Sequence, residues 1–114
     1  NNGKNGFVLE ALPIEVQVSP VFAIESTDVN HDSKDEVILG GNLFAVKPEI
    51  GRYDALHGIV LTPTGKGKYR WVKPTESGLN VHGEVRHIAK MKTTSGNRLL
   101  FIRNDDKVKM FEWK

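Results

Sequence analysis

The sequence contains no cysteine. A disulfide framework, a thiol nucleophile and a cysteine-based zinc site are therefore excluded, and both reducing and oxidising compartments remain open. No apolar run approaches the ~18 residues of a membrane-spanning helix. The polar start, Asn1 to Gly6, is neither a signal peptide nor a transit peptide. A start of this kind, without Met, leads us to expect a mature, proteolysed or engineered fragment of a larger protein.

An excess of one charge is also lacking. Lys and Arg total 16 and Asp and Glu total 14, which gives a formal charge of only +2. This balance predicts neither a nucleic-acid partner nor an anionic membrane surface, and the scattered basic residues are typical of solvated faces. With 114 residues, the chain is expected to form one compact unit, residues 1–114.

The sequence also lacks helical periodicity: no window of helical length carries an apolar stripe. Short β-branched and aromatic runs instead alternate with turn residues, among 11 Gly and 5 Pro. This pattern predicts an all-β protein. We expect strands buried on both faces at residues 21–26 and 36–41, and an edge strand ending before Pro13. The full set of predicted strands is 7–12, 14–18, 21–26, 36–41, 57–62, 68–72, 84–91, 98–103 and 107–113.

The strands fall into two successive antiparallel units that resemble β-propeller blades. Residues 21–73 would form one blade of four strands, and residues 84–114 a second, partial blade of three. The units repeat at a spacing of about sixty residues, slightly longer than a typical propeller repeat. Residues 6–12 are interpreted as the edge strand of an adjoining blade. They could supply the missing fourth strand of the second unit, from the same chain or from a neighbour.

Between two of these strands lies an acidic loop, DVNHDSKDE, which places oxygen-bearing side chains at positions 28, 30, 32 and 36. A hard cation such as Ca²⁺ takes six to eight oxygens, which alternating Asp and Asn residues plus a backbone carbonyl can supply. An empty acidic turn is the alternative, because Asp, Asn and Ser also favour turns through local hydrogen bonds. An EF-hand is excluded, because its twelfth position would be Leu39.

The four histidines form no spaced metal-binding pair, and hydrogen-bonded or surface positions explain them best. Zinc is not expected at the loop, since His31 is the only nitrogen ligand there and thiolates are absent. No Ser lies in a nucleophile-elbow context, and no phosphate-binding loop is complete. No catalytic residue is therefore predicted.

The segment from Asp28 to Gly40 resembles the calcium loop of FG-GAP, or VCBS-type, β-propeller repeats. The surrounding segments 19–24, 41–44, 51–55, 58–61 and 83–86 also resemble C-terminal repeats of secreted bacterial proteins of this type. The resemblance implies a calcium-binding propeller fragment. Its ligands would be the side chains of Asp28, Asn30, Asp32 and Glu36 and the backbone carbonyl of Lys34. Two positions depart from the family pattern: Ser33 replaces a glycine, and Glu36, next to the competing Asp35, replaces an aspartate.

The long connection between residues 42 and 56 is predicted to make the specific contacts. It carries Phe44, Arg52, Tyr53 and Asp54, the residue types that protein interfaces and sugar sites favour. The competing interpretation is that Phe44 and Tyr53 only pack the loop onto its own blade. Glu49 and Asp54 could be imagined as the acid and base of a glycosidase, but a solvated loop explains them better.

Two function classes follow. The first is a non-enzymatic, calcium-stabilised propeller module that serves adhesion, binding or assembly and is secreted, periplasmic or at the cell surface. Its partners would be the rest of a cleaved parent, copies of itself, or other extracellular proteins and glycans. The alternative is a fragment of a larger carbohydrate-active lyase or hydrolase with catalytic residues elsewhere. Millimolar external calcium suits the weak sites of extracellular modules.

Overall fold

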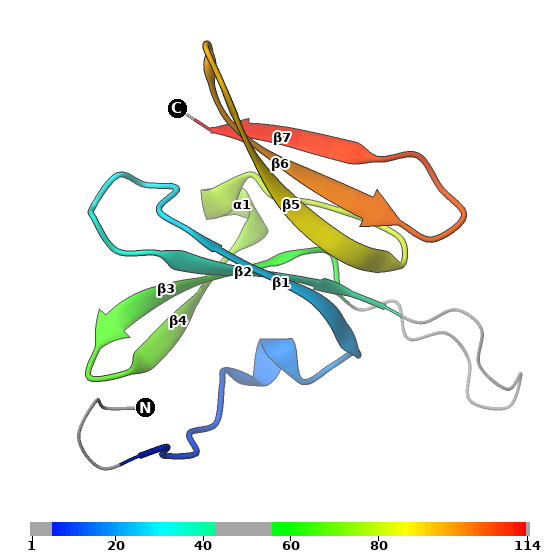
Figure 1. Cartoon of the computed structure of the whole chain (residues 1–114). Coiled ribbons are helices and arrows are strands. Elements are labelled where there is room, and N and C mark those ends of the chain that lie inside the picture. The colour runs from blue at the N-terminus through cyan, green and yellow to red at the C-terminus, as the bar shows by residue number, and fades with distance from the viewer. Residues whose placement is uncertain (1–5, 43–55, 114) are drawn as a thin grey trace, which may run out of the picture.

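The computed structural model describes residues 6–42 and 56–113. Two antiparallel sheets dominate the structure, with strand orders β1-β2-β3-β4 and β5-β6-β7 (Figure 1). This arrangement confirms the predicted all-β class. The elements are η1 (Ile14–Val16), β1 (Val21–Thr27), β2 (Glu36–Gly41), β3 (Ile59–Gly65), β4 (Lys68–Val72), α1 (Pro74–Ser77), β5 (Val85–Thr93), β6 (Gly96–Arg103) and β7 (Lys109–Trp113).

The first sheet begins with the hairpin that carries the acidic loop. Thr27 at the end of β1 pairs with Glu36 at the start of β2, so the loop is fixed at both ends by the ladder. β2 is the more buried strand, and five of its six residues are buried. This burial confirms the prediction for residues 36–41, because β2 lies inside its sheet and both of its faces are covered.

β1 differs from the prediction for residues 21–26. It lies at the edge of the first sheet, and only Ala23 among its residues is buried. Phe22 and Ile24 are 48% and 68% exposed, so the prediction of burial on both faces was wrong. An apolar run alone does not distinguish an interior strand from an edge strand that leaves one face in solvent.

The strands predicted in the N-terminal segment do not form within the single chain. Residues 7–12 form neither strand nor helix, because no neighbouring strand lies beside them within the described chain. Residues 14–16 form the 3-10 turn η1, with a hydrogen bond of 2.9 Å from the Gln17 N–H to the Ile14 carbonyl. Pro13 precedes this turn in an extended conformation, and its carbonyl accepts the Val16 N–H at 3.0 Å.

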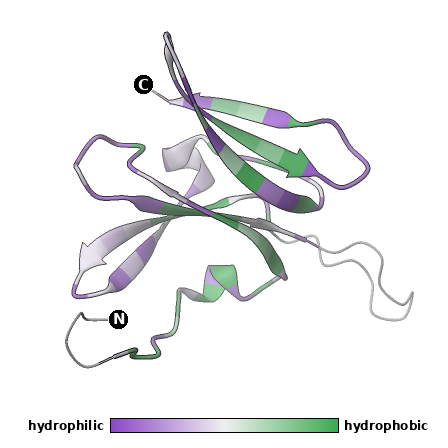
Figure 2. Ribbon diagram, viewed as in Figure 1, coloured by the Kyte–Doolittle hydropathy of each residue, from purple (hydrophilic) through white to green (hydrophobic). Residues whose placement is uncertain are grey.

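The main core lies between the two sheets. It comprises Ala23, Ile38, Val60, Leu79, Val81, Val85, Ile88, Leu99 and Phe101. Phe101 packs edge-on against Phe111, with ring centroids 5.6 Å apart. Close approach of β2 to β5 requires Gly40, because a Cβ atom there would lie 2.6 Å from Val85 Cγ1. Hydrophobic residues gather along the inner parts of the strands and around η1, whereas the loops at the strand ends are largely hydrophilic (Figure 2).

A second apolar cluster covers the opposite face of the first sheet. Val16 of η1 packs there with Leu39, Leu56, Ile59 and Leu61. Thus the first sheet is covered on both faces. The two sheets do not close into a ring within the described residues.

Candidate functional site: an acidic loop beside a cleft

The acidic loop folds its side chains inward onto its own backbone. The two carboxylate oxygens of Asp28 accept the N–H groups of Asp32 at 3.2 Å and of Ser33 at 2.9 Å. The Asn30 side-chain oxygen accepts the same Asp32 N–H at 3.0 Å. Asp32 in turn accepts the Lys34 N–H at 2.9 Å. Oxygens from positions 28, 30 and 32 therefore lie on the inside of one tight turn.

Two residues with left-handed backbone conformation produce this turn. His31 has φ 63° and Ser33 has φ 68°. Ser33 stands where the calcium-loop pattern has glycine, and it adopts the sharp-turn conformation expected for that position. A residue with a Cβ atom is disfavoured there by roughly 1–2 kcal/mol. The loop therefore keeps this shape at some cost in stability.

Glu36, at the start of β2, anchors the loop to the first sheet. Its side chain is only 1% exposed, and it accepts hydrogen bonds from the Val29 N–H at 3.0 Å and the Thr62 hydroxyl at 3.0 Å. Asn30 Nδ2 donates a third, at 3.1 Å. Among the described residues, no Lys, Arg or His side chain lies within ion-pair distance of Glu36. Its buried carboxylate is held by neutral donors alone, an arrangement that is costly for a charged group.

The Asn30 side-chain amide bridges the loop and its anchor. Its Nδ2 lies 3.3 Å from Asp32 Oδ2 and 3.1 Å from Glu36 Oε1. Two carboxylates thus converge on one partially positive N–H₂ group. Because the two ends of an amide have the same shape, rotation of Asn30 would bring its oxygen to the carboxylates instead. In that orientation three oxygens would converge, an arrangement that a bound cation would favour.

The predicted ligand set is therefore brought together in part. The side chains of Asp28, Asn30, Asp32 and Glu36 share one hydrogen-bond network, and the Lys34 backbone joins it through its N–H. Asp35 is turned to the Ser26 hydroxyl at 3.3 Å and is separate from the network. In residues 6–42 and 56–113, no three His, Asp or Glu side chains are grouped closely enough to hold a metal ion by themselves. The predicted set relies in addition on an amide and a backbone oxygen.

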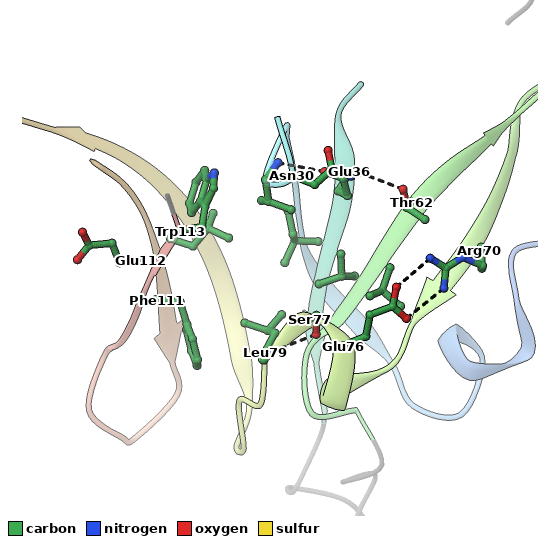
Figure 3. A pocket seen from close by; sticks show the side chains of 16 residues that line it. Asn30, Glu36, Thr62, Arg70, Glu76, Ser77, Leu79, Phe111, Glu112 and Trp113 are labelled. Atoms are coloured by element: carbon green, nitrogen blue, oxygen red, sulfur yellow. Dashed lines mark hydrogen bonds and ion pairs between the residues drawn. The ribbon is translucent and has the colours of Figure 1, made fainter. Parts of the chain in front are cut away.

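A cleft of about 460 Å³ adjoins the loop (Figure 3). One wall comes from the first sheet and α1, and the other from β6 and β7. Asn30, Glu36 and Thr62 form its polar end, whereas Phe111 and Trp113 line the opposite wall. No sequence pattern indicated the cleft, because it arises where two sheets distant in the sequence diverge.

Arg70 and Glu76 form a further polar group at the cleft. They join β4 to α1 through an ion pair of 3.1 Å between two exposed side chains (Figure 3). The hydrogen bond from Arg70 lowers the pKa of Glu76, and the same bond raises the pKa of Arg70. The pair holds α1 against the first sheet. Since both groups are solvated, its contribution to stability is small.

Asn42 is a buried polar residue that the sequence analysis missed. Its amide oxygen accepts the Leu56 N–H at 2.9 Å, and its Nδ2 donates to the Leu56 and Gly83 carbonyls. Arg86 donates to the Asn42 carbonyl at 3.0 Å. Asn42 therefore fixes the end of β2 to segments that are distant in sequence. A polar residue after an apolar run gave no signal that distinguished it from an ordinary turn residue.

Histidines that are distant in the sequence also meet. The rings of His57 and His82 are tilted against each other with centroids 4.2 Å apart. Neither their spacing nor their neighbours predicted this contact. The predicted contact residues Phe44, Arg52, Tyr53 and Asp54, with Glu49, lie outside the described residues.

Comparisons of the chain with protein-family models, curated proteins and solved structures give no match in any of the three cases. None of the helices in the described residues is long and apolar enough to cross a membrane.

Proposed function

We propose that this chain is a non-enzymatic, calcium-stabilised β-module of the FG-GAP or VCBS type. Its two sheets would be neighbouring propeller blades, and its role would be extracellular or cell-surface binding or assembly. The observation that carries this proposal is Glu36, a carboxylate that is 1% exposed and lies at the base of an acidic loop. Within residues 6–42 and 56–113 it has no cationic side chain at ion-pair distance.

The loop residues suit Ca²⁺ by their chemistry. Asp28, Asn30, Asp32 and Glu36 would supply side-chain oxygens, and Lys34 a backbone carbonyl. All are hard oxygen donors, the type that Ca²⁺ prefers. A cation would neutralise carboxylates that otherwise face one another, and the Asn30 amide would turn its oxygen inward. Glu36 would keep its bond to Thr62 and so connect the ion to the first sheet.

Calcium in this position would be structural. The loop joins β1 to β2, Glu36 contacts β3 through Thr62, and Trp113 of β7 donates to the Asp28 carbonyl at 3.2 Å. An ion held there would stiffen contacts between both sheets. Binding to the folded state alone stabilises by mass action, about 2.7 kcal/mol at ~100 times the dissociation constant.

The second sheet supports a role in assembly. On its outer face Leu100 pairs with Ala89 on one side and with Met110 on the other, which makes an apolar row across three strands. Met110 and Ile102 are 53% and 39% exposed. The first sheet has a cluster packed over its corresponding face, whereas the second sheet has none among the described residues. We propose that a further sheet, from the parent protein or from another copy, packs there.

Calorimetric titration with Ca²⁺ tests the proposal. The wild-type chain should bind one Ca²⁺ per chain with a weak, ~10⁻⁴ to 10⁻³ M, dissociation constant. The double variant Asp28→Asn, Asp32→Asn should lose binding, whereas Asp35→Asn should retain it. Absence of wild-type binding at millimolar Ca²⁺ would reject the calcium module. The alternative, a fragment of a carbohydrate-active enzyme, predicts turnover of a polysaccharide by the parent protein.

A further inference from the structure

The second sheet ends at a free strand edge. Among the described residues β7 pairs only with β6, so the N–H and C=O groups along its other edge have no strand partner. Unpaired strand edges are templates for the addition of another extended segment. We propose that this edge takes residues 7–12 of a second copy of the chain as a fourth strand.

The shape of the molecule beside β7 favours an added strand. Within the part of the chain that the structure describes, the first sheet has four strands and the second has three. The cleft opens between β7 and the outer part of the first sheet (Figure 3). Its walls include Val72, Leu79, Phe111 and Trp113. A strand paired to β7 would project alternate side chains toward these walls, because successive residues of a strand point to opposite faces.

Residues 7–12 have the complementary properties. Phe7, Val8 and Leu9 are 89%, 66% and 99% exposed, and the segment forms no helix or strand in its own chain. Exposure of successive large apolar side chains is unfavourable in water. Pro13 follows the segment, and it is the kind of residue that ends a strand. Six residues are enough to pair along the five residues of β7.

Position indicates a second copy. Glu10 is the only charged residue of the segment, and β7 carries one charge of each sign, Lys109 and Glu112, so charge permits a register that sets Glu10 opposite Lys109. In its own chain the segment lies on the far side of the first sheet from β7 (Figure 1). The first sheet therefore separates the donor from the acceptor within one molecule. Exchange between copies joins them without unfolding that sheet, either reciprocally in a closed dimer or successively in a chain.

This inference deepens the assembly part of the proposed function, and it does not depend on calcium. Sedimentation equilibrium of the full chain, with and without chelator, gives the association constant. We expect concentration-dependent association in both solutions. The double variant Val8→Pro, Leu9→Pro should weaken association by at least about tenfold. The N–H groups of two successive strand residues point to opposite edges, so one of the two must face β7, and proline cannot donate to a ladder. Val18→Asp is the control. Val18 is another exposed valine, but it lies outside both residues 7–12 and β7, so this variant should associate as the wild type does.

A peptide of residues 6–12 provides a direct readout on the acceptor. Added to the full chain carrying Val8→Pro, Leu9→Pro and Trp71→Phe, it should shift the fluorescence of Trp113, the remaining tryptophan. A scrambled peptide should not. A monodisperse wild-type monomer, equal association of the double proline variant and Val18→Asp, or no response to the peptide would overturn the inference. Calcium binding without association would reject strand exchange alone, and association without calcium binding would reject the calcium module alone.

Discussion

The indole Nε1 of Trp113 donates a hydrogen bond to the backbone carbonyl of Asp28 at 3.2 Å, across 85 positions of sequence. Trp113 ends β7 and lines the cleft, whereas Asp28 begins the acidic loop. This bond connects the proposed cation site to the second sheet. Binding of an ion at the loop should therefore change the environment of the Trp113 indole.

Trp113 should report calcium binding by its fluorescence. Trp71 belongs to the cluster on the opposite face of the first sheet, away from the loop. The Trp71→Phe variant should thus keep a fluorescence change on addition of Ca²⁺, and Trp113→Phe should lose it. A calcium response that depends on Trp71 instead would contradict the contact.

Trp113→Phe should also lower the free energy of unfolding. The change removes a hydrogen bond worth about 1 kcal/mol and part of a large apolar surface, so we expect a loss of about 1–3 kcal/mol in denaturant titration. Glu112→Gln serves as the neighbouring control, because Glu112 makes only a partly exposed ion pair with Arg98. That variant should differ from the wild type by about 1 kcal/mol or less.

Ser33→Gly should stabilise the chain. Glycine adopts the left-handed conformation of position 33, φ 68°, without the Cβ penalty. Offset by the greater freedom of glycine in the unfolded chain, the net gain should be about 1 kcal/mol or less. Lys34→Gly is the control in the same loop. Lys34 does not have positive φ, so that change should destabilise. Thermal melts that rank the two variants in the opposite order would contradict the loop geometry.

Gly40→Ala should destabilise the contact between the sheets. The new Cβ would lie 2.6 Å from Val85 Cγ1 and 2.9 Å from Val85 Cβ, so either strand must move. We expect a loss of about 1–3 kcal/mol in the free energy of unfolding, as for other overpacked cores. Val85→Ala removes the closer atom, Val85 Cγ1. In a double-mutant cycle, Gly40→Ala should therefore lower the free energy of unfolding less in the Val85→Ala background than in the wild type. Strict additivity of the two changes would show that the sheets are not packed at this point.

Acid should weaken the attachment of α1. The hydrogen bond from Arg70 lowers the pKa of Glu76 in the folded state. A carboxylate with a lowered folded pKa contributes stability above its unfolded pKa of about 4.3, and this is lost as the pH falls through the folded value. Glu76→Gln should abolish that part of the pH dependence and leave stability near neutral pH little changed, because the pair is exposed. If the free energy of unfolding depended on pH in the same way for the wild type and Glu76→Gln, the ion pair would not contribute to acid sensitivity, and the prediction would be wrong.

Most of the strands could be predicted from the sequence, since alternating and continuous apolar runs located β1 to β7 within a few residues. The failures have physical causes. Residues 7–12 have the composition of a strand, but a strand forms only beside a partner strand, and local composition does not reveal whether a partner is present. For 14–18, Pro13 opened a turn instead. The short helix α1 had a signal that was not used: Pro74 at its first position and Gly78 after its last.

The candidate site, too, could be predicted only in part. Local spacing was enough to identify the loop, because residues 28, 30 and 32 interact with backbone only a few positions away. The burial of Glu36, its bond to Thr62 and the contact with Trp113 depend on how strands pack across the chain. Such contacts leave no periodic signal in a single sequence. The same holds for the cleft and for Asn42.

The most direct test of calcium stabilisation is the thermal unfolding midpoint with Ca²⁺ and with chelator, compared between Glu36→Gln and Asp35→Asn. These neighbours differ in that Glu36 belongs to the loop network, whereas the Asp35 side chain lies outside it and accepts a hydrogen bond from the Ser26 hydroxyl. We expect millimolar Ca²⁺ to raise the unfolding midpoint of the wild type and of Asp35→Asn by several degrees, since a domain of this size gains about 4 °C per kcal/mol of stabilisation. Glu36→Gln should gain little. Equal midpoints of the wild type with calcium and with chelator, or an undiminished gain in Glu36→Gln, would contradict the central claim.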